Sequence, residues 1–396
     1  MAGKDFLDRE RQMSARSYAG NERQYLEEVL TSGNLSSLSG GKFVPRLEEA
    51  FAVAIGARHA VAMNSCMAAL HAGVMCAGAG AGDEVVCDSE FVFGAMAVLY
   101  ANAIPTFVDI DPVTHNMDPD KLEGAITEKT KAVIVTHAWG LPAEMDRILA
   151  VARRHKLLVI EDCAESILAA YKGRCTGSWG DVGCFSLQAS KQLSVGDGGM
   201  ATTNDPELCK GLGRHAGAPT FQSVAYGLDY NYRMNEPTAA IALAQLETLP
   251  AAIAQLRKHA TYYDQAVAGC PWLQLQRGPE DAEHTFYHWA ATFRGEEHGI
   301  PLKDFSAAVA EARLSSITVG YTKIPAYRHP VIRDRLAHAF SCAANRRSAE
   351  LYPDGLCPVA EHVIPRIVIG YLTEPEETAK QEADKLFRVV ERIGRG

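Results

Sequence analysis

The sequence lacks the long apolar runs that would place the chain in a membrane. None of its segments approaches the roughly 18 consecutive apolar residues that a transmembrane helix needs. Residues 1–20 are charged and polar without an apolar core, so we expect no secretory signal. These absences predict a cytoplasmic protein that binds no membrane.

The sequence also lacks the cysteine patterns of a disulfide framework or a zinc site. Its 10 cysteines are scattered and none forms a C-x-x-C pair. Several, such as Cys87 and Cys184, stand inside apolar runs. Buried free thiols in a reducing compartment explain this usage better than disulfides do, and we expect no bound metal.

Net positive charge is absent as well. The chain has 39 basic and 48 acidic residues, which gives a formal net charge of -9. Such a chain does not attract nucleic acid or an anionic membrane surface. Small anionic ligands need only a local site, so the expected partners are small molecules.

The sequence does contain a regular alternation of short apolar runs and helix-length segments. The runs are rich in β-branched residues and nearly continuous in apolar character, which is typical of strands covered on both faces. They span residues 59–63, 84–88, 105–109, 131–136, 156–161, 182–187 and 199–203. This alternation predicts an α/β layer around a mostly parallel, seven-stranded sheet.

After residue 235 the pattern changes. A long helical stretch over 236–268 leads into a smaller α+β region, which ends in an amphipathic helix over 374–394. We therefore expect a large domain over residues 1–250, with its first residues (roughly 20) as an arm. Residues 251–396 then form a small C-terminal domain.

The residues that follow the apolar runs are the candidates for function, because ligands of such sheets bind beyond the carboxyl ends of the strands. Asp162 ends one run, where it is either a helix cap or a buried acid paired with a cationic ring nitrogen. Lys191 stands between a strand and a glycine-rich turn. It is either a lysine that reaches solvent at a domain rim, or a partly desolvated amine whose lowered pKa lets it attack a carbonyl.

Together, Asp162 and Lys191 match the requirements of pyridoxal 5'-phosphate (PLP), which needs a lysine for its Schiff base and an acid on its pyridine nitrogen. PLP also needs a phosphate site. The turn at 64–70 opens a helix, so the free N–H groups of Cys66 and Met67 would face an anion. The same sequence is also compatible with a simple strand-to-helix turn that binds no ligand. Phe91 is either a core residue or a side chain that stacks on the ring, and Ser186 could offer its hydroxyl to the phosphate.

The glycine-rich segment at 77–84 is the one motif that suggests a different cofactor. It precedes an apolar run instead of following one, and its spacing differs from that of a dinucleotide-binding loop. We interpret it as a flexible turn.

Four segments resemble the DegT/StrS family of PLP-dependent sugar aminotransferases, which have the fold-type-I PLP fold. They are residues 104–119, 160–166, 184–200 and 228–247. The resemblance implies a homodimer with shared active sites. It implies that Lys191 carries the Schiff base and moves protons, and that Asp162 pairs with the pyridine nitrogen.

The resemblance also implies the other contacts of the cofactor. Phe91 falls where an aromatic side chain stacks on the ring, and Glu165 falls beside the ring, where Gln or His is frequent. The expected phosphate contacts are Cys66, Met67, Ser186 and, from the second subunit, Asn231.

Two departures from the family pattern concern binding more than the reaction. Residues 65–67 read Ser-Cys-Met where the family commonly has Ser-Gly-Thr, so the phosphate would depend on backbone amides and Ser186. The loop at 319–330 replaces a histidine-containing loop that helps to shape the acceptor site.

The implied reaction moves an amino group from glutamate or glutamine to a keto group of a nucleotide-linked sugar or a cyclitol, as in antibiotic or polysaccharide biosynthesis. Two alternatives are another PLP reaction on the same scaffold, such as dehydration or epimerisation, and a non-catalytic regulatory homologue. The family's known dehydratases resemble this chain but carry histidine in place of the lysine, so Lys191 disfavours dehydration. Intact Asp162 and Lys191 disfavour the regulatory alternative.

Overall fold

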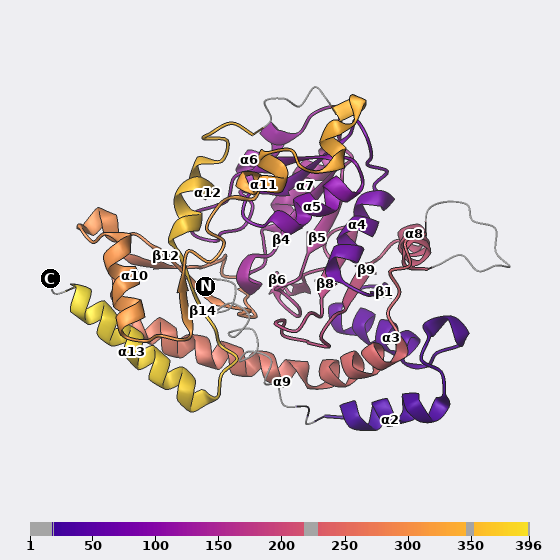
Figure 1. Cartoon of the computed structure of the whole chain (residues 1–396), viewed down its shortest axis with the longest axis horizontal. Helices are drawn as coiled ribbons and strands as arrows, with labels where there is room; N and C mark the ends of the chain where they lie inside the picture. The colour runs from indigo at the N-terminus through magenta and orange to yellow at the C-terminus, as the bar shows by residue number, and fades with distance from the viewer. Residues whose placement is uncertain (1–17, 19, 218–228, 346–351, 395–396) are drawn as a thin grey trace.

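The computed structural model describes residues 18, 20–217, 229–345 and 352–394. Residues 1–17 and 19 of the expected N-terminal arm, and Leu228, lie outside the described residues. Within them, the expected runs form one seven-stranded sheet in the order β1-β9-β8-β5-β4-β2-β3 (Figure 1). Its strands are β1 (His59–Met63), β2 (Glu84–Asp88), β3 (Ile104–Val108), β4 (Thr130–Thr136), β5 (Leu158–Asp162), β8 (Val182–Ser186) and β9 (Gly199–Thr203).

The sheet is mostly parallel, as the sequence predicts. β3, β2, β4, β5 and β8 run parallel in that spatial order, whereas β9 is antiparallel to both β8 and β1. β5 ends one residue later than expected, so Asp162 is itself part of the ladder, opposite Thr136 on β4 and Cys184 on β8. The carboxyl ends of β5 and β8 are therefore neighbours.

Helices cover both faces of the sheet because successive strand residues point to opposite sides. On one face Val85 and Ile134 belong to the same apolar cluster as residues of α4 (Cys66–Cys76), α5 (Val92–Tyr100) and α8 (Pro206–Ala216). On the other face Val86 and Val133 pack with α7 (Met145–Arg154). Further along that face the sheet meets α2 (Glu22–Ser32), α3 (Phe43–Ile55) and the start of α9 (Glu236–Ala266).

A second, antiparallel sheet lies in the C-terminal region, in the order β10-β12-β14-β13. Its strands are β10 (Leu273–Leu275), β12 (Trp289–Phe293), β14 (Ile367–Gly370) and β13 (Ile317–Val319). They pack with α10 (Leu302–Glu311) and α13 (Glu376–Gly394). The smaller elements include α6 (Pro119–Leu122), α11 (Pro330–Arg333), α12 (Pro358–Val363), and a sheet of β11 (Ala282–Glu283), β6 (Ala170–Tyr171) and β7 (Arg174–Cys175), besides short 3-10 helices.

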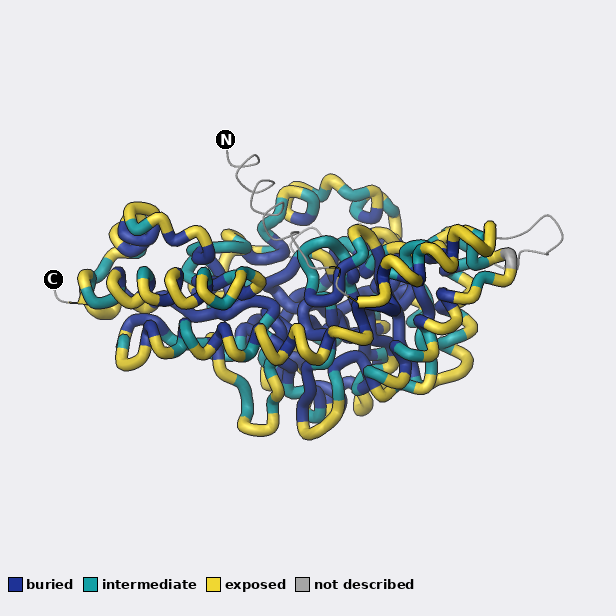
Figure 2. Tube along the Cα trace, turned by 90° about the horizontal axis from the view of Figure 1, so that it is seen from below, coloured by how far each residue is buried: buried dark blue, intermediate teal, exposed yellow. Residues whose placement is uncertain are grey.

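Helix α9 connects the two sheets and runs along the lower side of the molecule in Figure 1. Its side chains up to Ile253 pack with α2 and α3, whereas those from Leu256 onward pack with α13 and the second sheet. The proposed domain boundary near residue 250 falls within this helix. By length and composition α9 could cross a membrane, but more than half of its most apolar window is buried, as in the core helix of a folded protein. Figure 2 shows that exposed residues form the outer surface of the described chain and buried residues fill its interior.

Candidate active site

Asp162 is buried at the carboxyl end of β5, and Lys191 follows the neighbouring strand β8. The Asp162 side chain accepts a hydrogen bond from the Ala164 N–H at 3.0 Å through Oδ1. The thiol of Cys66 lies 3.9 Å from the same oxygen. Oδ2 accepts no hydrogen bond from any residue that the structure describes, so it remains available to a ligand. A residue that only caps a turn would make the same hydrogen bond to the Ala164 N–H. The geometry is therefore compatible with both expected roles of Asp162, as a cap and as the partner of a cationic ring nitrogen.

The surroundings of the Asp162 carboxyl disfavour its charged form. Burial raises its pKa from the usual 3.8 to about 6, although the Ala164 N–H and the Lys191 ammonium act in the opposite direction. The carboxylates of Asp88 and Glu165 add to the rise. A cation placed at Oδ2 would lower this pKa again, which is what a protonated pyridine nitrogen would do.

Lys191 is largely buried, with 15% of its side chain exposed, and its Nζ lies 3.5 Å from Oε1 of Glu165. One of the two alternatives for Lys191 was a partly desolvated amine with a lowered pKa, whereas the groups around it in this structure raise that pKa. Burial does lower the pKa of Lys191, but Tyr287, Glu165 and Asp162 raise it by more, so it lies above its usual value. No local pattern in the sequence indicates that two acids and a phenol converge on one amine.

The N-terminus of α4 offers an anion site of the kind that the PLP phosphate needs. The Ser65 hydroxyl accepts from the Ala68 N–H at 3.1 Å. The N–H groups of Cys66 and Met67 have no partner among the described residues. Unpaired N–H groups at a helix N-terminus bind anions, and the helix dipole assists.

Gly199 brings β8 and β9 against this helix terminus. It pairs with Ser186 across the ladder, so the Ser186 hydroxyl lies on the strand end next to the turn. A Cβ at Gly199 would lie 2.5 Å from the backbone nitrogen of Cys66. Only glycine allows the strand to approach so closely, and the resulting cradle suits a phosphate group beside Asp162.

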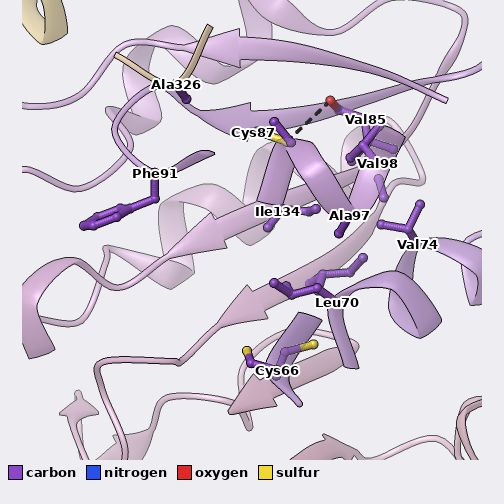
Figure 3. Close-up of a cluster of buried hydrophobic side chains, with 14 of the residues drawn as sticks. Cys66, Leu70, Val74, Val85, Cys87, Phe91, Ala97, Val98, Ile134 and Ala326 are labelled. Atoms are coloured by element: carbon purple, nitrogen blue, oxygen red, sulfur yellow. Dashed lines mark hydrogen bonds between the residues drawn. The ribbon is translucent and has the colours of Figure 1, made fainter. Parts of the chain in front are cut away.

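Phe91 and Glu165 are joined to the site through Trp139. The backbone N–H of Trp139 donates to Oε2 of Glu165 at 2.9 Å. The Trp139 and Phe91 rings meet edge to face, with their centroids 5.2 Å apart. Figure 3 shows the Phe91 ring extending away from Leu70 and Ile134, which pack together in the core. Phe91 nevertheless belongs to the same buried apolar cluster as these residues, so its position leaves both expected roles open.

Asn231 precedes Tyr232, whose carbonyl accepts a hydrogen bond from the Asn64 N–H at 2.6 Å, so this segment meets the strand-to-helix turn of its own chain. Asn231 is exposed, its backbone is in the left-handed region at φ 59°, and its N–H donates to the Gly217 carbonyl at 2.9 Å. This backbone hydrogen bond stabilises the local turn. It neither supports nor excludes a contact between Asn231 and a second subunit. Its contact with a partner's phosphate stays a prediction.

The His137, Glu161 and Cys163 side chains form a group in which a metal could be held, within the part of the chain that the structure describes. The imidazole Nδ1 of His137 accepts from the Ala143 N–H, so its Nε2 carries the proton and donates to Glu161 at 3.0 Å. Glu161 also accepts from the N–H groups of Gly177 and Gly180, at 2.8 and 2.6 Å. Because these bonds already satisfy the imidazole and the carboxylate, the group is explained as a structural network.

Three aromatic residues around Lys191 and Glu165 were not expected from the sequence: Trp139, Tyr287 and His288. Trp139 lies three positions after the end of β4. The rule that ligands bind at strand ends predicts a site at this edge of the sheet, but it does not identify Trp139 as part of that site. Tyr287 and His288 come from a segment about one hundred residues after Lys191. The aromatic run at 286–289 was the only local signal, and it does not indicate which part of the fold it meets.

Comparison with known proteins identifies relatives along most of the chain. Residues 17–356 match the model of the DegT/DnrJ/EryC1/StrS aminotransferase family. A GDP-perosamine synthase of Caulobacter vibrioides is 42% identical over 253 residues, which cover 63% of this chain and 68% of that protein. An L-glutamine:2-deoxy-scyllo-inosose aminotransferase of Streptomyces lividus is 32% identical, over 84% of this chain and 80% of that protein.

A solved structure of DesV from S. venezuelae, in complex with a ketimine intermediate, has a similar fold. It superimposes with a TM-score of 0.82 at 26% identity, over 94% of this chain and 95% of that one.

Gly199→Ala tests the cradle. The added methyl group meets backbone atoms that cannot move cheaply, so it displaces the start of α4. We expect the dissociation constant for PLP, measured by titration of the cofactor-free protein, to rise about tenfold. Gly213→Ala is the matched control, because a Cβ there meets no atom within 4 Å in α8. Wild-type affinity in Gly199→Ala would place the phosphate elsewhere.

Proposed function

The chain belongs to the DegT/DnrJ/EryC1/StrS aminotransferase family, and on that premise we propose that it uses PLP to move an amino group from glutamate or glutamine to a keto group of a nucleotide-linked sugar or a cyclitol. The observation that carries this proposal is the meeting of Asp162, Lys191 and the N-terminus of α4 at one edge of the sheet. These groups offer an acid, an amine and an anion cradle, which are the contacts that PLP requires. When bound, PLP supplies an electron sink that stabilises the negative charge left at a substrate Cα when its proton departs.

The resemblance to the family supports the other roles, and the positions of these residues are compatible with them. Asp162 Oδ2 holds the ring nitrogen protonated, and the N–H groups of Cys66 and Met67, with the Ser186 hydroxyl, bind the phosphate. Lys191 carries the cofactor and, once released, moves the proton at Cα. Glu165, fixed by the Trp139 N–H, lies beside the ring, and Phe91 covers one of its faces.

The substrate class rests on the relatives. The names of the Caulobacter and Streptomyces proteins describe a nucleotide-linked sugar product and a cyclitol substrate, and the latter name also gives glutamine as donor. A place in antibiotic or polysaccharide biosynthesis accords with both. We assign the chain to the cytoplasm, where free thiols and soluble sugar intermediates occur together.

The two-domain division at residue 250 and the homodimer belong to the same proposal. A closed dimer with two-fold symmetry would bring Asn231 of each subunit to the phosphate site of the other. The left-handed backbone at Asn231 restricts the direction of its side chain. It does not determine whether that side chain contacts a second subunit.

Lys191→Arg and Lys191→Ala together test the reaction. Arginine keeps the positive charge beside Glu165 and Asp162 but cannot attach the cofactor or release a proton. We expect both variants to lose at least about a thousandfold in transamination rate, within the range of acid–base catalysis. In the wild type, borohydride reduction followed by peptide mapping should locate PLP on Lys191. Wild-type turnover in Lys191→Arg, or label on a different lysine, would refute the assignment.

Mixing of subunits tests the shared site. Asp tolerates the left-handed backbone as Asn does, so Asn231→Asp keeps the turn but sets a negative charge against the phosphate. We expect Asn231→Asp and Lys191→Ala to be inactive separately. After subunit exchange, half of the dimers would contain one intact site, and about a quarter of wild-type activity should return. If no activity returns although exchange is confirmed by mass spectrometry, Asn231 does not serve the partner's site.

A further inference from the structure

Glu165 forms an ion pair with Lys191 that none of the roles above explains. The Lys191 Nζ lies 3.5 Å from Oε1 of Glu165, and the two side chains are 15% and 10% exposed. Salt screens a partly buried pair much less than an exposed one, so each charge acts strongly on the other. The pair therefore bears on the chemistry of the amine itself.

The Glu165 carboxylate is held in place from two sides. Its Oε2 accepts from the Trp139 N–H at 2.9 Å, which leaves Oε1 to face the amine. The Glu165 carbonyl accepts from the side-chain amide of Gln192 at 2.8 Å. Gln192 directly follows Lys191, so this bond ties the segment that carries the acid to the segment that carries the amine. The carboxylate is thus fixed relative to the chain on which Lys191 stands.

The Tyr287 ring lies on the same amine. The Lys191 Nζ is 4.1 Å from the ring centroid, close enough for the face of an aromatic ring to attract a cation. The turn that fixes Glu165 also positions this ring, because the His288 N–H donates to the Trp139 carbonyl at 3.3 Å. Glu165 and Tyr287 both attract the positively charged form of the amine more strongly than its neutral form.

The pKa shifts of the pair agree with this geometry. Burial lowers the pKa of Lys191, but Tyr287 and Glu165 raise it by more. Burial raises the pKa of Glu165, and the Lys191 charge and the Trp139 N–H act against that rise. Each member of the pair thus favours the charged form of the other.

We propose that Glu165 is a positioning residue that holds the Lys191 amine in its protonated form over the Tyr287 ring. This inference rests on the proposed function, in which the amine takes a proton from Cα and later returns it. A new N–H bond then forms as the Cα–H bond breaks, and the electron pair of the broken bond stays on the carbon side. Glu165 takes no proton. Its negative charge balances the positive charge that the amine has gained, so the proton stays on Lys191 until it is returned.

Glu165→Gln tests this role in the full-length, cofactor-free chain. Glutamine keeps an oxygen for the Trp139 N–H but removes the charge beside the amine. Trace acetylation with acetic anhydride, followed by peptide mass spectrometry, reports the fraction of Lys191 present as a free amine at each pH. Loss of the opposite charge should lower the pKa of Lys191 by about one unit. Its labelling at neutral pH should then rise about tenfold, and its titration should move to lower pH.

Glu90→Gln is the matched control. Glu90 lies two residues after β2, is 1% exposed, and neither of its carboxyl oxygens has a partner among the described residues. Burial, with Asp88 and Glu165, raises the pKa of Glu90 well above its usual value, so glutamine there removes little charge. Its Lys191 labelling should equal that of the wild type. Lys258, paired with Glu376 at 2.8 Å on the exposed side of α9, is the internal reference and should label equally in all chains.

Two results of the labelling would overturn the proposal. One is wild-type labelling of Lys191 in Glu165→Gln. The other is an equal rise in Glu90→Gln, or a parallel rise at Lys258, because either would indicate general loosening and not the loss of one charge.

Turnover separates this proposal from the proposed function. If the chain transaminates, Glu165→Gln should lower kcat about tenfold with the KM for the amino donor unchanged. The limb of its pH profile that requires the free amine should move to lower pH. If the wild-type chain does not transaminate, the proposed function fails, while the labelling still decides whether Glu165 controls the amine. If wild-type turnover is normal and Glu165→Gln retains the wild-type kcat and pH profile, only the positioning role fails.

Discussion

The buried carboxylate of Asp162 is the constraint on which the rest of the site depends. Its pKa rises from 3.8 to about 6, so the folded chain without cofactor loses stability as the pH rises through that interval. The full loss is roughly 3 kcal/mol and is reached above the folded-state pKa. Lys191 offsets only part of the cost, and Oδ2 has no donor within the described residues. A cationic ring nitrogen at this oxygen would recover most of the energy.

The same edge of the sheet separates two opposite charge preferences. Asp162 and Glu165 favour a cation near the ends of β5 and β8. A short distance away, the N–H groups of Cys66 and Met67, which have no partner among the residues that the structure describes, favour an anion at the start of α4. PLP carries a protonated ring nitrogen and a phosphate at opposite ends, so one molecule satisfies both preferences. This complementarity explains why the chain can keep several buried acids around one lysine.

The main sheet could be predicted from the sequence because its strands are buried on both faces and read as short apolar runs. The rule that ligands bind at strand ends then identified Asp162 and Lys191, and β5 and β8 do pair. The raised pKa of Lys191 and the contact with Tyr287 could not be predicted. Both depend on the C-terminal segment at 284–288 returning to the Trp139–Gly140 turn, and backbone bonds between distant segments leave no periodic signal. The position of Asn231 relative to a second subunit could not be predicted either, because it depends on contacts between two chains.

The thermal midpoint of Asp162→Asn at neutral pH, with and without PLP, tests the central constraint most directly. Asparagine keeps the oxygen that accepts from the Ala164 N–H but removes the buried charge. Without PLP, the variant should unfold at a higher temperature than the wild type, and addition of PLP should stabilise it much less than it stabilises the wild type. A variant that is less stable than the wild type without PLP, and that gains as much from the cofactor, would show that the carboxylate is only a cap.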